Sequence, residues 1–158
     1  MELPLIQLKN YKYINNKSED ITIEESNKIQ LIGFYFTGSW CLPCLEFEKQ
    51  LVNFYTEINY KEKIFEIIQV SFEKDEESFK NYIKDTPWVF LQYNDPKVSE
   101  LGQFFSIKHV PSMIISTRDG VILSDEGRND IASSEPSSKA VEKWIKQLKL
   151  QKERDRLA

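Results

Sequence analysis

An apolar run followed closely by two cysteines constrains the fold of this chain more than any other feature. The run Leu31–Phe36 (LIGFYF) carries no charged side chain, which is typical of a central strand covered on both faces. The cysteines follow within the segment Trp40–Cys44 (WCLPC). From Cys44 onward, large apolar side chains recur at helical spacing, namely Phe47, Leu51, Phe54, Tyr55 and Ile58. The pattern therefore predicts a strand, a turn that carries the cysteines, and a helix.

The thiols of Cys41 and Cys44 can close and open a disulfide without moving the fold, because two residues separate them at a strand-to-helix turn. Unpaired amide groups at the helix N-terminus stabilise the thiolate of Cys41. Cys41 is therefore the predicted nucleophile, and Cys44 is the predicted resolving thiol. Two alternatives fit less well. Inert buried cysteines would not need this position, and a structural zinc site needs about four ligands, whereas the chain has two cysteines and one histidine.

Length, charge and hydropathy exclude several classes of protein. The 158 residues fit one domain, and the net charge of −4 provides no broad basic field for nucleic acid or an anionic membrane. No apolar stretch approaches the ~20 residues that span a bilayer. Met1–Ile6 lacks the basic flank and the long apolar region of a secretory signal. The lack of such a signal favours a reducing compartment, so we expect a cytoplasmic protein, with the nucleus as the alternative. In such a compartment a lone CxxC pair is more often catalytic than structural.

The rest of the pattern alternates strands and helices. Strands are predicted at Ile64–Val70, Ser112–Ile115 and Val121–Leu123, a short extended segment at Pro87–Leu91, and helices at Asp75–Ile83, Pro96–Phe105 and around Val141–Leu148. This order predicts an α/β fold with a central mixed sheet, closed by an antiparallel hairpin and covered by helices on both faces. Sites in such sheets lie at the carboxyl ends of strands, where Cys41 and Glu73 both fall.

Three parts are predicted along the chain. Residues 1–28 form a polar N-terminal extension with a short strand around Ile6–Leu8 and a helix start at Thr22–Glu25, which has capping-box spacing. Residues 29–150 form the folded domain. Residues 151–158 form a charged tail that we expect to be frayed.

The order of strand, WCxxC turn and later Val110–Pro111 pair resembles the thioredoxin fold, and most closely the tryparedoxin/nucleoredoxin branch of that family. The residues that carry the resemblance are Phe34–Cys44, Phe79, Tyr82, Pro87–Trp88, Val110–Pro111 and Gly127–Arg128. The chain departs from the branch at four positions. It has Leu42, Leu45, Lys49 and Phe72 where the branch has a proline, a basic residue, a helix-kinking proline and a tryptophan. These departures concern the electron donor more than the exchange chemistry.

The resemblance implies a thiol–disulfide oxidoreductase that reduces protein disulfides, with peroxiredoxin-type peroxidases among its clients. Cys41 would attack a client disulfide and Cys44 would resolve the mixed disulfide. A small glutathione-like thiol or a flavoprotein reductase would supply the electrons. Besides the redox-active disulfide, no cofactor or metal is implied, and we expect a monomer with no nucleic-acid or membrane partner. The main alternative is a redox-sensitive adaptor, similar to nucleoredoxin, that captures a partner rather than turning over; a non-catalytic scaffold is a further one.

The resemblance also assigns Trp40, Val110, Pro111 and Arg128 to substrate binding. Trp40 would shield Cys41, the alternative being a tryptophan that only packs. The Val110–Pro111 bond would be cis and would present the Val110 backbone to an extended peptide or a glutathione-like ligand. Arg128, expected in a loop after the last strand, would attract an anionic thiol, with a plain surface arginine as the alternative.

Proton transfer to and from Cys44 needs a further group. Thioredoxins place a buried aspartate on the strand before the cysteines, where this chain has Tyr35, as the tryparedoxin-like branch does. Glu73 is the nearest candidate by topology, and a solvated carboxylate at a strand end is the alternative. His109 is expected to be a loop histidine, with proton donation as the alternative.

Overall fold

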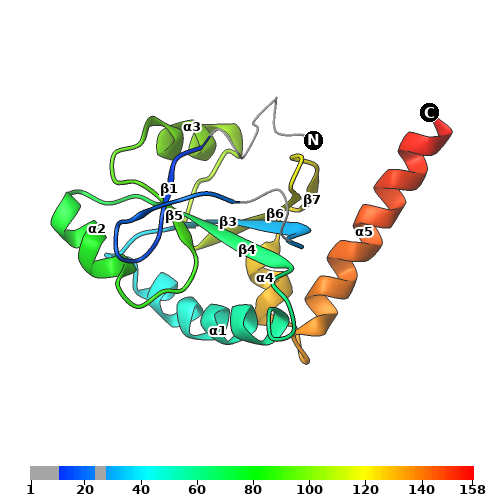
Figure 1. Cartoon of the computed structure of the whole chain (residues 1–158), viewed down its shortest axis with the longest axis horizontal. Helices are drawn as coiled ribbons and strands as arrows, with labels where there is room; N and C mark the ends of the chain where they lie inside the picture. The colour runs from blue at the N-terminus through cyan, green and yellow to red at the C-terminus, as the bar shows by residue number, and fades with distance from the viewer. Residues whose placement is uncertain (1–10, 24–27) are drawn as a thin grey trace.

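The computed structural model describes residues 11–23 and 28–158 and is built on a seven-stranded mixed sheet. The strands lie in the order β2–β1–β5–β4–β3–β6–β7 (Figure 1). Their bounds are β1 Tyr13–Ile14, β2 Asp20–Ile21, β3 Leu31–Thr37, β4 Phe65–Ser71, β5 Val89–Leu91, β6 Ser112–Thr117 and β7 Ile122–Ser124. The predicted mixed sheet, with an antiparallel hairpin of β6 and β7 at one side, is confirmed.

The register of β3 brings the predicted site segments to one edge of the sheet. β3 runs parallel to β4, with Thr37 opposite Ser71, so both strands end at the same edge. β6 runs antiparallel to β3, and its first residue, Ser112, pairs with Phe36. The segment before β6 therefore arrives at the edge where the cysteine turn leaves β3.

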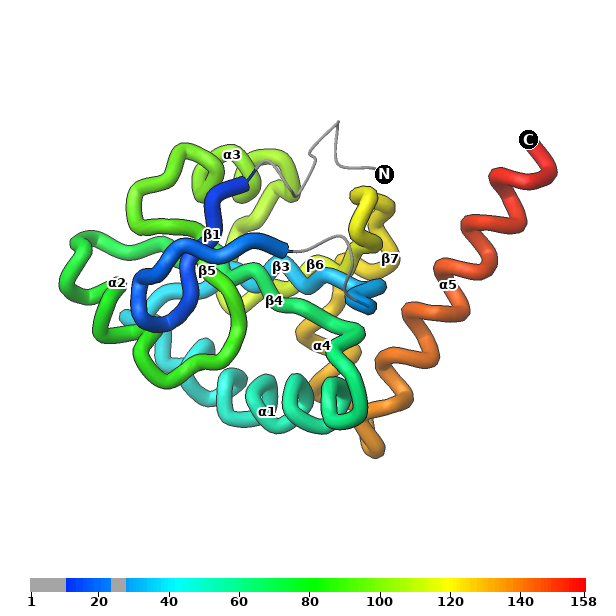
Figure 2. Tube along the Cα trace, in the orientation of Figure 1, coloured from blue at the N-terminus to red at the C-terminus, as the bar shows by residue number. Residues whose placement is uncertain are grey.

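In the described ranges, five helices accompany the sheet. They are α1 Leu42–Ile58, α2 Glu76–Ile83, α3 Pro96–Phe104, α4 Gly127–Ala132 and α5 Ser138–Leu157. Two of them begin at aspartate caps: Asp75 accepts a hydrogen bond from the N–H of Ser78 at 2.7 Å, and Asp95 accepts one from the N–H of Lys97 at 2.9 Å. The far end of α5 extends away from the sheet (Figure 2).

Successive side chains of the central strands point to opposite faces of the sheet, so the hydrophobic core has two parts, one on each face. The face that packs on α1 and on the start of α5 includes Leu31, Tyr35, Phe65, Ile67, Met113 and Ile115, with Leu51, Phe54 and Trp144 from the helices. The face that packs on α3 includes Ile32, Phe34, Phe36, Ile68, Val70 and Ile114, with Leu101 from α3. Figure 1 shows α1 and α3 on opposite sides of the sheet. All seven residues of β3 are buried, as its lack of charge predicted.

Some elements differ from the predictions. β1 and β2 lie within the predicted N-terminal extension, and β1 pairs antiparallel with β5, so part of this extension belongs to the sheet. α4 contains Arg128, which corrects its predicted loop position. α5 continues to Leu157, which corrects the expected frayed tail after Gln151. Strands of two residues and a helix of six carry too little periodicity to be found in a sequence.

The predicted strand at Ile6–Leu8 and the end of the capping box at Thr22–Glu25 lie outside the described residues. The division into an extension, a domain and a tail stays a prediction. Within the described ranges, no helix combines the length and the apolar character that crossing a membrane requires.

Candidate active site

The cysteine pair sits where α1 begins. Cys41 is the N-terminal cap of α1, with φ −99° and ψ 105°, and its Sγ accepts a hydrogen bond from the backbone N–H of Cys44 at 3.2 Å. The two cysteines form a disulfide. Pro43 occupies the first turn, where a missing N–H costs no intrahelical bond. Because Cys41 caps α1, the positive end of the helix dipole faces its sulfur, which is the sulfur predicted to attack.

The two sulfurs differ in access. Cys41 is 6% exposed, whereas Cys44 is fully buried at 0%. An incoming disulfide can therefore approach Cys41 only. This difference agrees with the predicted roles of Cys41 as nucleophile and Cys44 as resolving thiol.

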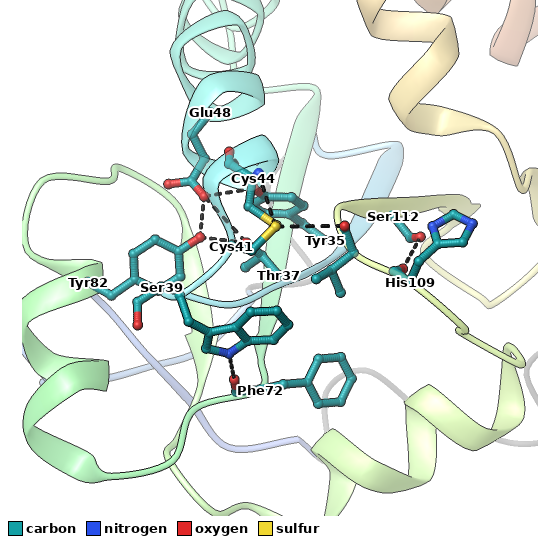
Figure 3. Close-up of a disulfide and its surroundings, with 12 residues drawn as sticks. Tyr35, Thr37, Ser39, Cys41, Cys44, Glu48, Phe72, Tyr82, His109 and Ser112 are labelled. Carbon is teal, nitrogen blue, oxygen red and sulfur yellow. Dashed lines mark hydrogen bonds between the residues drawn. A yellow bond between two sulfur atoms is a disulfide. The ribbon is translucent and has the colours of Figure 1, made fainter.

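The Val110–Pro111 bond is cis, as the resemblance implied, and lies against the disulfide. The carbonyl oxygen of Val110 is 3.7 Å from Sγ of Cys41. Ser112 Oγ donates a hydrogen bond to the carbonyl oxygen of His109 at 2.8 Å, and the exposed imidazole of His109 points away from the sulfurs (Figure 3). The loop before β6 therefore contributes backbone, rather than an ionisable side chain, to the site.

Trp40 flanks the cysteines on the side of β4. Its side chain is 64% exposed. Its Nε1 donates a hydrogen bond to the carbonyl oxygen of Phe72 at 2.7 Å. An open groove of about 470 Å³ begins at Trp40 and runs past Glu73 and Tyr93 to the start of α3 at Asp95. The indole is thus held at one edge while the rest of its surface is available for contact.

Glu73 follows the end of β4, where it was expected, whereas Arg128 lies in α4 and not in a loop. Oε2 of Glu73 accepts a hydrogen bond from the N–H of Ser39 at 2.8 Å, so Glu73 fixes the loop that leads to the cysteines and is not a freely solvated carboxylate. Its Oε1 is buried and has no hydrogen-bond partner in the described parts of the chain. Arg128 is half-buried in α4, and no hydrogen bond or ion pair between described residues joins it to the disulfide.

The structure reveals a buried carboxyl group, Glu48, one helical turn after Cys44 (Figure 3). Its Oε2 accepts hydrogen bonds from the hydroxyl groups of Tyr35 at 2.7 Å, of Thr37 at 3.4 Å and of Tyr82. The hydroxyl of Tyr35 also lies 3.4 Å from the carbonyl oxygen of Cys44. Glu48 therefore joins α1, β3 and α2 one turn below Cys44.

Burial controls the ionisation of this cluster. It raises the pKa of Glu48, and the hydrogen bonds from Tyr82, Tyr35 and Thr37 oppose that rise without cancelling it. Burial also raises the pKa of Tyr35 and of Tyr82, so both side chains stay neutral donors. The carboxyl group of Glu48 consequently holds a proton at a higher pH than an ordinary glutamate does.

Sequence reasoning missed Glu48, although a signal for it exists. The buried face of α1 consists of Cys44, Phe47, Glu48, Leu51, Phe54 and Tyr55. Glu48 is the one charged type in that stripe, and it lies four residues after Cys44, on the same face of the helix. An acidic residue at a core position of an amphipathic helix is uncommon enough to mark a functional candidate.

Apolar side chains are exposed around Cys41. Leu42 is 67% exposed and Leu45 is 39% exposed, both in the first turn of α1 and next to the exposed Trp40 along the chain. Exposed apolar groups that gather at one place are typical of a surface that contacts a partner.

Known proteins share this architecture. The thioredoxin-like family matches residues 28–122. Nucleoredoxin from Xenopus laevis is 33% identical over 121 residues, which are 75% of this chain and 28% of that protein. The chain spans less than a third of the length of the curated relatives that it matches.

Solved structures give the same likeness. Tryparedoxin II from C. fasciculata superposes with a TM-score of 0.73 at 30% identity, over 81% of this chain and 84% of that one. A structure of tryparedoxin II complexed with glutathionylspermidine superposes with a TM-score of 0.74 at 26% identity, over 84% of this chain and 94% of that one.

Proposed function

Because this chain belongs to the thioredoxin-like family, with nucleoredoxins and tryparedoxins among its relatives, we propose that it is a thiol–disulfide oxidoreductase that reduces protein disulfides through Cys41 and Cys44. One observation carries the proposal. Cys41 caps α1 and retains some exposure, whereas Cys44 is fully buried one turn further on. This arrangement separates attack on a client from resolution of the mixed disulfide.

The reaction proceeds by two exchanges at sulfur. The thiolate of Cys41 attacks a client disulfide, one client sulfur leaves as a thiolate, and a mixed disulfide forms. Cys44 then attacks the sulfur of Cys41, the second client sulfur leaves, and the Cys41–Cys44 disulfide closes. Two electrons pass from the dithiol to the client. A donor thiol returns the protein to its reduced state through the same steps in reverse order.

Client binding uses the surface around Cys41. The Val110 backbone, held by Pro111 against the sulfurs, pairs with an extended client segment. The exposed faces of Trp40 and Leu42 supply apolar contact. Arg128 lies on α4. It therefore contributes to binding only when an anionic client or thiol extends from this surface to α4.

The electron donor is a small glutathione-like thiol or a flavoprotein reductase, and peroxiredoxin-type peroxidases are the proposed clients. A related tryparedoxin II has been solved with glutathionylspermidine, which supports a small thiol. This chain has Leu45 and Lys49 where the resemblance implies a basic residue and a proline, so we expect no strict dependence on a polyamine-linked thiol. We further propose that the protein acts as a monomer in a reducing compartment, the cytoplasm or the nucleus, where a lone dithiol stays reducible.

Turnover tests the function directly. The reduced protein is mixed with a disulfide-bonded test protein and an excess of glutathione, or with a flavoprotein reductase and its nicotinamide donor. We expect many disulfides to be reduced per molecule. Cys44→Ser should stop turnover and accumulate a mixed disulfide through Cys41, and Cys41→Ser should form none.

The rival function, a redox-sensitive adaptor, predicts another result. One disulfide would then be captured per molecule, without turnover under any donor. That outcome would replace the oxidoreductase by the adaptor. Turnover with a glutathione–polyamine conjugate alone would overturn the proposed donor while leaving the reaction intact.

A further inference from the structure

We propose that Glu48 accepts the thiol proton of Cys44 when Cys44 resolves the mixed disulfide, and returns it when the disulfide is reduced; this inference rests on the proposed function. Glu48 acts on Cys44 and not on the client, so it is a positioning and proton-transfer residue. The geometry that supports it is a buried carboxylate one turn below the resolving thiol, bound by three hydroxyl groups from β3 and α2.

The buried position of Cys44 creates the need for a proton acceptor. Cys44 is 0% exposed, and burial away from water disfavours the charged form of a thiol. Only the thiolate attacks a disulfide at a useful rate. Since solvent does not reach Cys44, a nearby base must take the proton, directly or through one water molecule.

Glu48 is the group best placed for that role. It lies four residues after Cys44 on the buried face of α1, and the Tyr35 hydroxyl lies within hydrogen-bond distance of both Oε2 of Glu48 and the carbonyl oxygen of Cys44. Tyr35 and Tyr82 remain neutral and donate hydrogen bonds to the carboxylate, so neither serves as the base.

The other charged group that faces Glu48 is Glu73, whose negative charge adds slightly to the raised pKa of Glu48. Its Oε2 is engaged by the N–H of Ser39. Among the described residues, no lysine, arginine or histidine forms an ion pair or a hydrogen bond with Glu48. A buried carboxylate without a cationic partner binds a proton more readily than a paired one does.

The step balances in protons and electrons. The S–H bond of Cys44 breaks as its proton moves to Glu48, its sulfur forms a bond to the sulfur of Cys41, and the client sulfur leaves with the electron pair of the broken S–S bond. During reduction, a donor thiolate attacks Cys41, and Cys44 leaves as a thiolate. That thiolate takes the proton back from Glu48.

A coloured aromatic disulfide separates the two exchanges in a stopped-flow experiment. Attack by Cys41 releases the first coloured thiolate in a phase that depends on reagent concentration. Resolution by Cys44 releases the second in a phase that does not. The variant Glu48→Gln keeps the size and an acceptor oxygen but cannot take the proton. Glu46→Gln, which removes an equal charge from an exposed position of α1, is the matched control.

We expect Glu48→Gln to leave the first phase unchanged and to slow the second about 100-fold at neutral pH. The deficit should shrink as the pH rises, because a higher pH favours the thiolate of Cys44 whether or not Glu48 is present. Glu48→Asp, which keeps an acid, should recover part of the rate. Glu46→Gln should match the unaltered protein in both phases.

Three results would overturn the inference. The first is a second phase in Glu48→Gln that equals that of Glu46→Gln. The second is a slowing that stays constant over the whole pH range, which indicates a purely structural role. The third is a slow second phase in Glu73→Gln alone, which would make Glu73 the acceptor. The absence of both phases in the unaltered protein would instead refute the proposed function, so the two failures can be told apart.

Discussion

The indole of Trp40 lies so close to Gly38 that a methyl group built on Gly38 would come within 2.5 Å of Nε1. Non-bonded carbon and nitrogen atoms do not approach so closely. The absence of a side chain at Gly38 therefore lets the indole fold back and donate its hydrogen bond to the carbonyl oxygen of Phe72. One glycine thus sets the position of the exposed ring beside Cys41.

Gly38→Ala should move the indole and weaken client binding. We expect KM for a disulfide-bonded protein to rise about fivefold or more, because a displaced aromatic anchor costs about 1 kcal/mol or more. Trp88 and Trp144 are buried, so a soluble quencher of tryptophan fluorescence reports chiefly on Trp40. Quenching should change in the variant.

The double variant with Trp40→Ala provides the control. If Gly38 acts through the indole, Gly38→Ala should add nothing to the effect of Trp40→Ala on KM. Additive losses would show that Gly38 affects the site by another route.

In the reduced protein, Cys41 should react with an alkylating reagent well before Cys44. The helix N-terminus favours the Cys41 thiolate, and Cys44 is buried at 0% exposure. Mass spectrometry of samples quenched at short times identifies the labelled peptide position. Cys41→Ser should lose the fast phase and Cys44→Ser should keep it. Early labelling of Cys44 would contradict the assigned roles.

Asp130→Asn should destabilise the fold at neutral pH by about 1–3 kcal/mol, because Asp130 links three elements. Its carboxylate accepts hydrogen bonds from Trp144 Nε1 at 2.9 Å, Ser124 Oγ at 2.6 Å and Lys143 Nζ at 2.5 Å. Burial alone would raise the pKa of Asp130, but these donors together lower it below the ordinary 3.8. Denaturant unfolding measures the loss.

The pH dependence of that loss follows from the lowered pKa. The contribution of Asp130 is present above the ordinary value of 3.8 and disappears as the pH falls through the lower value of the folded state. The difference in unfolding free energy between Asp130→Asn and the unaltered protein should therefore shrink in acid. Asp125→Asn, at an exposed position nearby, should stay within about 0.5 kcal/mol at every pH. An equal loss in both variants would contradict the role of Asp130.

Glu48→Gln should stabilise the fold, whereas Asp130→Asn should destabilise it. Burial raises the pKa of Glu48, so the folded state disfavours the charged form. The two proteins should be nearly equal in stability at a pH below 4.5, where the carboxyl group is protonated in both states. As the pH rises through the folded pKa, the unaltered protein should become the less stable one. Urea unfolding over a range of pH measures this, and a constant difference would contradict it.

Sequence patterns predicted the parts of the fold with strong periodicity. The charge-free strand β3 and the apolar stripe of α1 each carry a local signal that the packing reinforces. β1 and β2 escape prediction because each has two residues and owes its strand geometry to its neighbours. α4 is likewise too short to show a period, which is why Arg128 was expected in a loop.

The part of the candidate site that lies in a sequence motif was predictable. The part that forms only when distant segments pack together was not. Cys41 and Cys44 follow from spacing alone. The cluster around Glu48 draws Tyr35 and Thr37 from β3 and Tyr82 from α2, and only the folded chain brings these together. No local pattern joins residues so far apart in sequence.

The lengths of the outer strands bear on how this protein would withstand the clients proposed for it. β2 has two residues and β7 has three, whereas β3 and β4 at the centre have seven each. In the part of the chain that the structure describes, the two margins of the sheet therefore offer little unpaired backbone to a foreign strand. Partly unfolded chains with accessible disulfides also expose aggregation-prone strands. A protein that reduced such chains repeatedly would gain from sheet edges that offer an aggregate little backbone to pair with.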